Sequence, residues 1–266
     1  EEEGIDGAVK RGVPESVAAS IFDEIMDFAN YAFNKAHAVC YAVVSYRTAY
    51  LKCHYPREYM AALLTSVLDW SEKISEYIAS TREMGIAVLP PDVNESFDGF
   101  SVSGENIRFG LAAVKGVGRG FMKQLVAERE QHGLFLSFQQ FCERMFDREL
   151  NRRAVESLIK AGAFDSLGYR RSQLLQIANL VLDAVSQARK RNIEGQMDLF
   201  GMGNESVQDS EIALPDIQEA SKRELLAMEK ETTGLYLSGH PMDEYGDLAR
   251  AANAASIRAI IDDLSG

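Results

Sequence analysis

Apolar residues recur at steps of three and four along most of this sequence, and this spacing constrains the fold more than any other feature. The first such series, from Val17 to Phe28, predicts one amphipathic helix. The pattern continues from residue 31 to residue 64, where Pro56 can begin a second helix. The sequence therefore predicts a mainly α protein.

The next elements are marked by glycine and proline. Asp69 and Glu72 have the spacing of a capping box for another helix, and that helix should end near Gly85. Shorter apolar steps around residues 103–106 predict one small β-hairpin. Helices should then resume through residue 190, and a last helix is expected over residues 216–230.

The composition fits a globular chain with room for one large domain or two modest ones, since 46% of the 266 residues are hydrophobic. Three cysteines without metal-ligand spacing predict reduced thiols in a cytoplasmic protein without a metal site. No apolar run of about 18 residues occurs, so no membrane segment is expected. The missing initiator Met suggests that the sequence begins inside a longer protein.

The net charge of -12 hides a strong asymmetry along the chain. Residues 1–27 carry 2 Lys/Arg and 8 Asp/Glu, whereas residues 105–171 carry 12 and 8, and residues 198–266 carry 5 and 14. A basic middle between acidic flanks is compatible with a local site for a polyanion, and equally with an uneven solvated surface.

The segment from Leu111 to Arg119 is the most informative local feature, because it predicts two helices joined by a glycine hairpin. Gly116 and Gly118 flank Val117 and would allow positive φ and a close backbone approach. Lys115 and Arg119 add positive charge beside the free N–H groups of the second helix, which favour phosphate. An ordinary turn between helices is the alternative, since Gly-x-Gly alone is weakly diagnostic.

A second, looser copy of this pattern follows. Lys160 and Gly162 stand between two apolar helices, with Arg152 and Arg153 upstream. Paired helix-hairpin-helix elements can hold duplex DNA through its backbone, so contacts of this kind would carry no sequence preference. The nine candidate DNA-binding residues are Lys115, Gly116, Val117, Gly118, Arg119, Arg152, Arg153, Lys160 and Gly162.

A different kind of site is predicted in the stretch from residue 192 to residue 204, which has no helical period and is expected to be a flexible loop. Its apolar pair Leu199 and Phe200 suggests docking. With Gln196 and Asp198, the pair resembles the short peptide by which bacterial replication proteins bind the sliding clamp. Packing of the apolar pair against the protein body is the alternative.

Lys35, His37 and Arg47 are cations within an aromatic-rich helical stretch. By themselves they indicate only a helix with some polar positions, and a structural histidine is the simpler interpretation.

Taken in order, six stretches of the chain resemble the alpha-subunit family of bacterial DNA polymerase III. They are FNKAHAVCYAVVSYRTAYLKCHYPREYMAALLTS, MGIAVLPPDVNESF, IRFGLAAVKGVG, LNRRAVESLIKAGAFDSLG, QMDLF and ETTGLYLSGHP. The resemblance implies that residues 1–91 are the later part of the fingers and that 92–175 are a tandem helix-hairpin-helix domain. Residues 176–204 would carry a helix and the clamp-binding loop, and 205–266 a linker helix that leads toward an oligonucleotide-binding fold.

The resemblance also implies a function. The longer protein would be a DNA-directed DNA polymerase with magnesium bound by palm carboxylates, while this chain would hold duplex DNA, the sliding clamp and other holoenzyme subunits. Lys35, His37 and Arg47 would lie near the incoming nucleotide. No catalytic or metal-binding residue and no cofactor is expected within the chain itself, because closely spaced acidic residues in a strand context are missing.

The rival hypothesis is a non-enzymatic adaptor of replication or repair that uses the same hairpins and clamp peptide.

Overall fold

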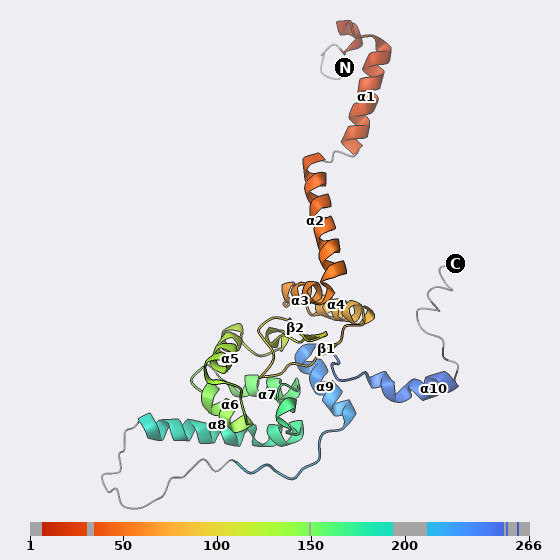
Figure 1. Ribbon diagram of the computed structural model, residues 1–266. Helices are drawn as coiled ribbons and strands as arrows, with labels where there is room; N and C mark the ends of the chain where they lie inside the picture. Colours follow the sequence, from red (N-terminus) through yellow and green to blue (C-terminus); the bar gives the residue numbers. More distant parts are fainter. Residues whose placement is uncertain are drawn as a thin grey trace, which may run out of the picture. The chain divides into compact units, whose positions relative to one another are not determined.

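The computed structural model describes residues 7–30, 35–148, 150–193, 212–252, 254 and 260 (Figure 1). The chain divides into two compact units, Glu1–Pro56 and Arg57–Gly266. Among the described residues, no helix has both the length and the apolar character that crossing a lipid bilayer requires.

The first unit contains a short 3-10 turn, η1 (Val9–Arg11), and two long helices, α1 (Glu15–Asn30) and α2 (Lys35–His54). The helices expected in this region are therefore confirmed. Large apolar side chains of α1 are exposed, including Ile21, Phe22 and Phe28.

The second unit begins with helices α3 (Pro56–Ser66) and α4 (Ser71–Glu83), which lie beside a small sheet (Figure 1). Strands β2 (Ser101–Ser103) and β3 (Asn106–Arg108) form the expected antiparallel hairpin. The sequence pattern missed β1 (Val88–Leu89), which pairs in parallel with β3 and gives the sheet order β1-β3-β2. The predicted capping box at Asp69 is wrong, because α4 follows Trp70 without a side-chain cap.

The helix-hairpin-helix region then folds around an apolar core. Its helices are α5 (Arg119–His132), α6 (Phe138–Met145), α7 (Arg152–Lys160) and α8 (Arg171–Ile193), with short 3-10 turns η2 (Leu111–Ala113) and η3 (Asp165–Leu167). Phe138 and Phe141 both meet the ring of Phe164 edge to face, at centroid distances of 5.1 and 4.9 Å. This core holds the two hairpins in fixed positions relative to each other.

The described part of the second unit resumes at residue 212. Helix α9 (Lys222–Thr233) lies against α7, and it is followed by η4 (Pro241–Tyr245) and α10 (Gly246–Ala251) (Figure 1). The predicted helix over residues 216–230 thus begins later, at a complete capping box formed by Ser221 and Glu224. Residue Leu237 is buried in the same apolar cluster as Met60 and Ile107.

The mainly α fold with helix-hairpin-helix elements and a small β-hairpin is confirmed. The loop expected over residues 192–204 lies largely outside the described residues. The structure adds that residues on both sides of position 91 share one core, since Leu64 and Ile78 pack in the same cluster as Phe109. The predicted boundary between the fingers and the helix-hairpin-helix domain, after residue 91, therefore lies within one apolar core.

Candidate nucleic-acid interface

The first hairpin is tighter than the sequence pattern suggested. The helix expected before it is only the 3-10 turn η2, and α5 follows it. Gly116 has φ +84°, as expected, but Gly118 has φ −73°, which any residue can adopt. Gly118 is instead the N-cap of α5 and offers no side-chain acceptor to the first N–H groups of this helix.

The second hairpin follows α7 and is closed by a Schellman arrangement. Gly162 has φ +83°, its N–H donates to Ile159 O (2.9 Å), and the N–H of Ala163 donates to Leu158 O (2.9 Å). An added Cβ at Gly162 would collide with the Arg171 guanidinium. Glycine is therefore required here both for the backbone conformation and for space.

The two hairpins meet along one face of α7. A Cβ placed on Gly116 would lie 3.0 Å from Ser157 Oγ and 3.3 Å from Arg153 Nε, so the first hairpin approaches α7 closely. A cleft of about 330 Å³ opens at this junction, and we call it the hairpin cleft. It is lined by Lys115, Arg153, Glu156, Ser157, Lys160, Glu231 and Thr232.

Three of the predicted cations converge in the hairpin cleft: Lys115, Arg153 and Lys160. Two carboxylates accompany them, because Lys160 Nζ lies 2.9 Å from Glu156 Oε1 and 3.1 Å from Glu231 Oε1. Hydrogen bonds to these carboxylates, that of Glu156 first, raise the pKa of Lys160 above its ordinary value. Lys160 is therefore charged and already partnered, and a phosphate must compete with Glu231 for it.

The remaining predicted cations do not line this cleft. Arg119, at the start of α5, forms an ion pair with Asp69, and Arg152 forms one with Asp183 on α8. All four side chains are more than half exposed, so these pairs leave the arginines accessible to solvent. Val117 is partly buried and packs against both apolar clusters, which makes it a structural residue of the hairpin.

Sequence reasoning missed the contribution of α9 to the cleft. The N–H of Lys115 donates to Thr232 O (2.7 Å), which ties the first hairpin to the end of α9. Glu229 is fully buried on the same helix, and its Oε1 lies 3.2 Å from both terminal nitrogens of Arg171. The sequence signal was the stretch ETTGLYLSGHP, which begins 71 positions after Lys160 of the second hairpin and 112 positions after Arg119 of the first, and no local pattern links it to either.

The other predicted site residues are not brought to this cleft. Lys35, His37 and Arg47 all lie on α2, and the tilted rings of His37 and Tyr41 have their centroids 4.3 Å apart. Since successive residues of a helix are about 100° apart, Lys35 and His37 point to nearly opposite sides of α2. Gln196, Asp198, Leu199 and Phe200 lie outside the described residues. In the part of the chain that is described, no group of three or more His, Cys, Asp or Glu side chains could hold a metal ion.

Comparison with known proteins identifies both the motif and the relatives. A helix-hairpin-helix motif family matches residues 85–174. DNA polymerase III subunit alpha of Deinococcus radiodurans is 43% identical over 93% of this chain and 18% of that protein. The same subunit of Mycobacterium tuberculosis is 43% identical over 97% of this chain and 22% of that protein, and that of Thermus aquaticus is 44% identical over 94% and 20%.

The chain thus spans about a fifth of the length of the relatives that it matches. The sequence similarity to these relatives extends over both units and is not confined to the hairpin region. The resemblance expected from the sequence is confirmed: over nearly its whole length, this chain is homologous to a segment of DNA polymerase III alpha subunits.

Proposed function

We propose that this chain is the duplex-binding part of a replicative DNA polymerase and that it holds DNA without sequence preference. The convergence of both glycine hairpins on one cleft with Lys115, Arg153 and Lys160 carries this proposal. The first N–H groups of α5, which no N-cap side chain engages, and these cations are groups that bind phosphate oxygens. Phosphate contacts of this kind position a duplex and carry no information about its bases.

The enzymatic part of the proposal concerns the longer protein. Nucleotidyl transfer needs carboxylates that hold two metal ions, and we expect them, with magnesium, outside residues 1–266. The chain alone should therefore be inactive. Similarity over 93–97% of the chain, and not over the hairpins alone, favours a polymerase over a non-enzymatic adaptor. We expect other holoenzyme subunits as partners and the cytoplasm as the location.

The cleft is tested with the Lys115→Gln, Arg153→Gln double variant of the full chain. Its affinity for a 20-base-pair duplex, measured by fluorescence anisotropy, should fall for two unrelated sequences alike. The slope of log affinity against log salt should become less steep by about two, because each variant side chain leaves one phosphate without its cation. An unchanged slope and affinity would remove DNA binding from this cleft.

The opposite change is expected when the competing carboxylate is neutralised. Glu231→Gln should strengthen duplex binding about two- to fivefold at low salt, because Lys160 then no longer has to break its ion pair with Glu231 to bind a phosphate. Glu130→Gln removes an equal charge from exposed Glu130 on α5, away from the cleft lining, and serves as the matched control. If both variants strengthen binding equally, the effect is one of net charge alone.

A second proposed role is tethering of the sliding clamp by Gln196, Asp198, Leu199 and Phe200. An apolar pair beside glutamine and aspartate fits a peptide that binds through a few side chains. The Leu199→Ala, Phe200→Ala double variant should lose clamp binding in a pull-down with purified clamp while its duplex affinity stays unchanged. Full retention of the clamp by this variant would place the tether elsewhere.

A third proposed role is nucleotide contact by Lys35, His37 or Arg47 in the longer protein. Because α2 directs Lys35 and His37 to different sides, one ligand could meet only a subset of the three. Single alanine variants of the longer polymerase, compared by KM for nucleotide, would identify that subset. Three unchanged KM values would return all three residues to a structural role.

A further inference from the structure

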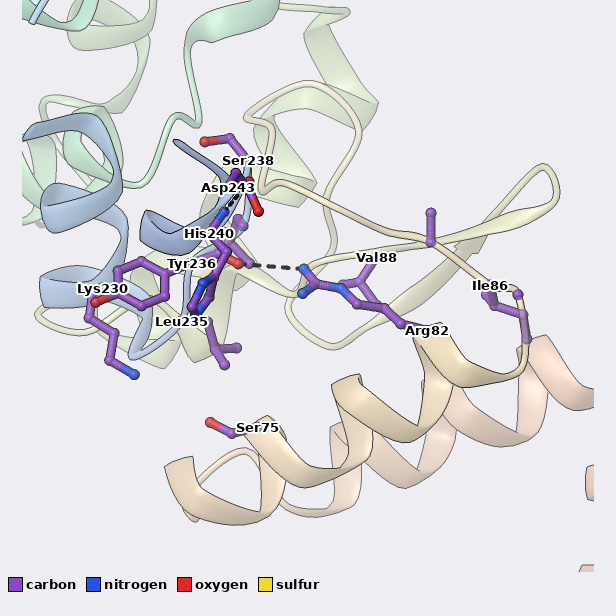
Figure 2. A pocket seen from close by; sticks show the side chains of 14 residues that line it. Ser75, Arg82, Ile86, Val88, Lys230, Leu235, Tyr236, Ser238, His240 and Asp243 are labelled. Carbon is purple, nitrogen blue, oxygen red and sulfur yellow. Dashed lines mark hydrogen bonds between the residues drawn. The ribbon is translucent and has the colours of Figure 1, made fainter. Parts of the chain in front are cut away.

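A second cleft lies in the same unit and has no lining residue in common with the hairpin cleft. It has a volume of about 750 Å³, within the usual range of ligand-binding clefts. We call it the β1 groove: residues 85–88 form one wall and residues 235–240 the other (Figure 2). Arg82 reaches across it from α4, and its Nη2 donates to Tyr236 O (3.5 Å).

The first wall of the β1 groove includes the free edge of a sheet. The N–H groups of Ile107 and Phe109 donate to Ala87 O and Leu89 O, both at 3.0 Å. In a parallel pair, this pattern directs the N–H and C=O of the intervening Val88 away from β3. Among the described strands, β1 is at the end of the sheet order and has no partner on that side. Such an edge is a template for an added strand, which must reach it from within the groove because Val88 is only 5% exposed.

The charges that line the β1 groove are mostly positive. Arg82, Lys230 and His240 all contribute side-chain N–H groups, and Lys230 Nζ already donates to Gly234 O (2.7 Å). His240 Nδ1 accepts the N–H of Met242 (3.1 Å), so its Nε2 carries the hydrogen and can donate. The one carboxylate of the lining, Asp243, is engaged by the N–H of His240 at 2.7 Å.

We propose that the β1 groove binds an extended, acidic peptide segment of a partner protein. The peptide backbone pairs with the outer edge of β1 at Val88, as a fourth strand of the sheet. Its carboxylates accept hydrogen bonds from Arg82 and Lys230, and its small apolar side chains lie against Ile86 and Leu235. This proposal is independent of duplex binding at the hairpin cleft, because the two sites share no residue.

Single-stranded nucleic acid fits the groove less well. A strand of that kind is held mainly by stacking of its bases on aromatic faces. The phenol ring of Tyr236 in the lining already has Lys230 Nζ 5.3 Å from its centroid, and it packs edge to face with the ring of His240 at a centroid distance of 5.5 Å. Backbone pairing along β1 and an apolar wall serve a peptide better.

The test uses a fluorescein-labelled octapeptide of alternating aspartate and valine with the full 266-residue chain, followed by anisotropy. A peptide with lysine in place of aspartate should not bind. Affinity for the acidic peptide should fall about tenfold in the Arg82→Gln, Lys230→Gln variant, a loss of charged hydrogen bonds worth about 1.4 kcal/mol. Arg153→Gln, a change of charge in the other cleft, should leave peptide affinity unchanged.

Three further arms make the result decisive. N-methylation of alternate peptide amides should abolish binding, because the methyl groups block pairing with β1. The Arg82→Glu, Lys230→Glu variant should gain affinity for the lysine peptide, which a merely unfolded variant would not do. Absence of acidic-peptide binding, insensitivity to N-methylation, or displacement of the peptide by a 12-residue oligothymidine at lower concentration would each overturn the proposal, the last in favour of nucleic acid.

Discussion

Gly162 and Gly168 have nearly the same positive φ in very different surroundings. Their φ values are +83° and +82°. A Cβ on Gly162 would strike Arg171 and Asp165, whereas a Cβ on Gly168 would meet no atom within 4 Å. Arg171 is buried, and although burial lowers its pKa, its hydrogen bond to Asp165 and its pairing with Glu229 outweigh that effect and raise the pKa. The side chain that Gly162 accommodates is thus a charged group that holds α9 to the hairpin region.

Alanine at the two glycines should therefore separate backbone strain from steric displacement. Gly168→Ala should lower the free energy of unfolding by about 1 kcal/mol, the cost of a left-handed alanine. Gly162→Ala should cost roughly 3–5 kcal/mol, because it also disturbs a buried ion pair. Urea unfolding followed by circular dichroism measures both values. Equal losses would mean that Arg171 moves aside without cost.

At the scale of single residues, the sequence was a good guide to cations and a poor guide to their partners. It identified Lys160, but it could not indicate that Glu231 approaches from 71 positions away. The sequence pattern also led us to expect a positive φ at both Gly116 and Gly118, but of these two only Gly116 has one. The spacing of residues indicates which side chains share a helix face, whereas ion pairs across the core depend on tertiary packing.

Among the elements, α8 depends on a cap that comes from distant sequence. Glu219 accepts the N–H groups of Arg171 (2.8 Å) and Ser172 (3.0 Å) at the first turn of α8. Burial by itself raises the pKa of Glu219, but the hydrogen bonds from Ser172, Ala220 and Arg171 together lower it below the ordinary value. The ionised carboxylate therefore stabilises the folded state.

The lowered pKa fixes the direction of the pH dependence. Since the folded state holds the proton of Glu219 less tightly than the unfolded chain does, its contribution is complete above the unfolded pKa and is lost as pH falls through the folded pKa. Glu219→Gln should cost about 1 kcal/mol at pH 7, a typical value for a lost cap. The difference from the parent chain should shrink below about pH 4.

Urea unfolding at a series of pH values tests this expectation. Glu83→Gln on the exposed surface of α4 provides the control, and it should show little difference from the parent chain at any of these pH values. A Glu219→Gln difference that stays constant down to about pH 3 would show that the charge of the carboxylate is irrelevant to the cap.

The elements themselves were predictable where the apolar period ran for several turns. Helices α1 and α3 follow that period, and α3 begins at Pro56, whereas the apolar residues of α2 are spread around the helix and none of them is buried. Shorter signals failed: Asp69 pairs with Arg119 instead of capping α4, and α9 begins at the Ser221 capping box instead of at residue 216. Strand β1 has only two residues, too few for an alternating pattern, and it forms because β3 offers its edge.

For the whole molecule, both apolar clusters are built from residues of the second unit. One runs from Val93 to Val185, and the other joins Met60 to Leu237. Local sequence patterns cannot reveal this long-range packing, because Leu237 lies more than 100 positions after the sheet residues with which it packs. The sequence therefore indicated the hairpin region correctly and left its dependence on the last helices unseen.

This distribution of the cores predicts how the chain responds to shortening from either end. A chain of residues 57–266 should unfold cooperatively at nearly the melting temperature of the full chain and keep its duplex affinity, because no core residue is removed. A chain of residues 1–211 should melt far lower, since it lacks the Glu219 cap, the Glu229 partner of Arg171 and buried Leu226 and Leu237. Differential scanning calorimetry and duplex anisotropy measure both. Were the 1–211 chain the more stable of the two, the helices after residue 211 would be appendages, and the hairpin cleft would form without them.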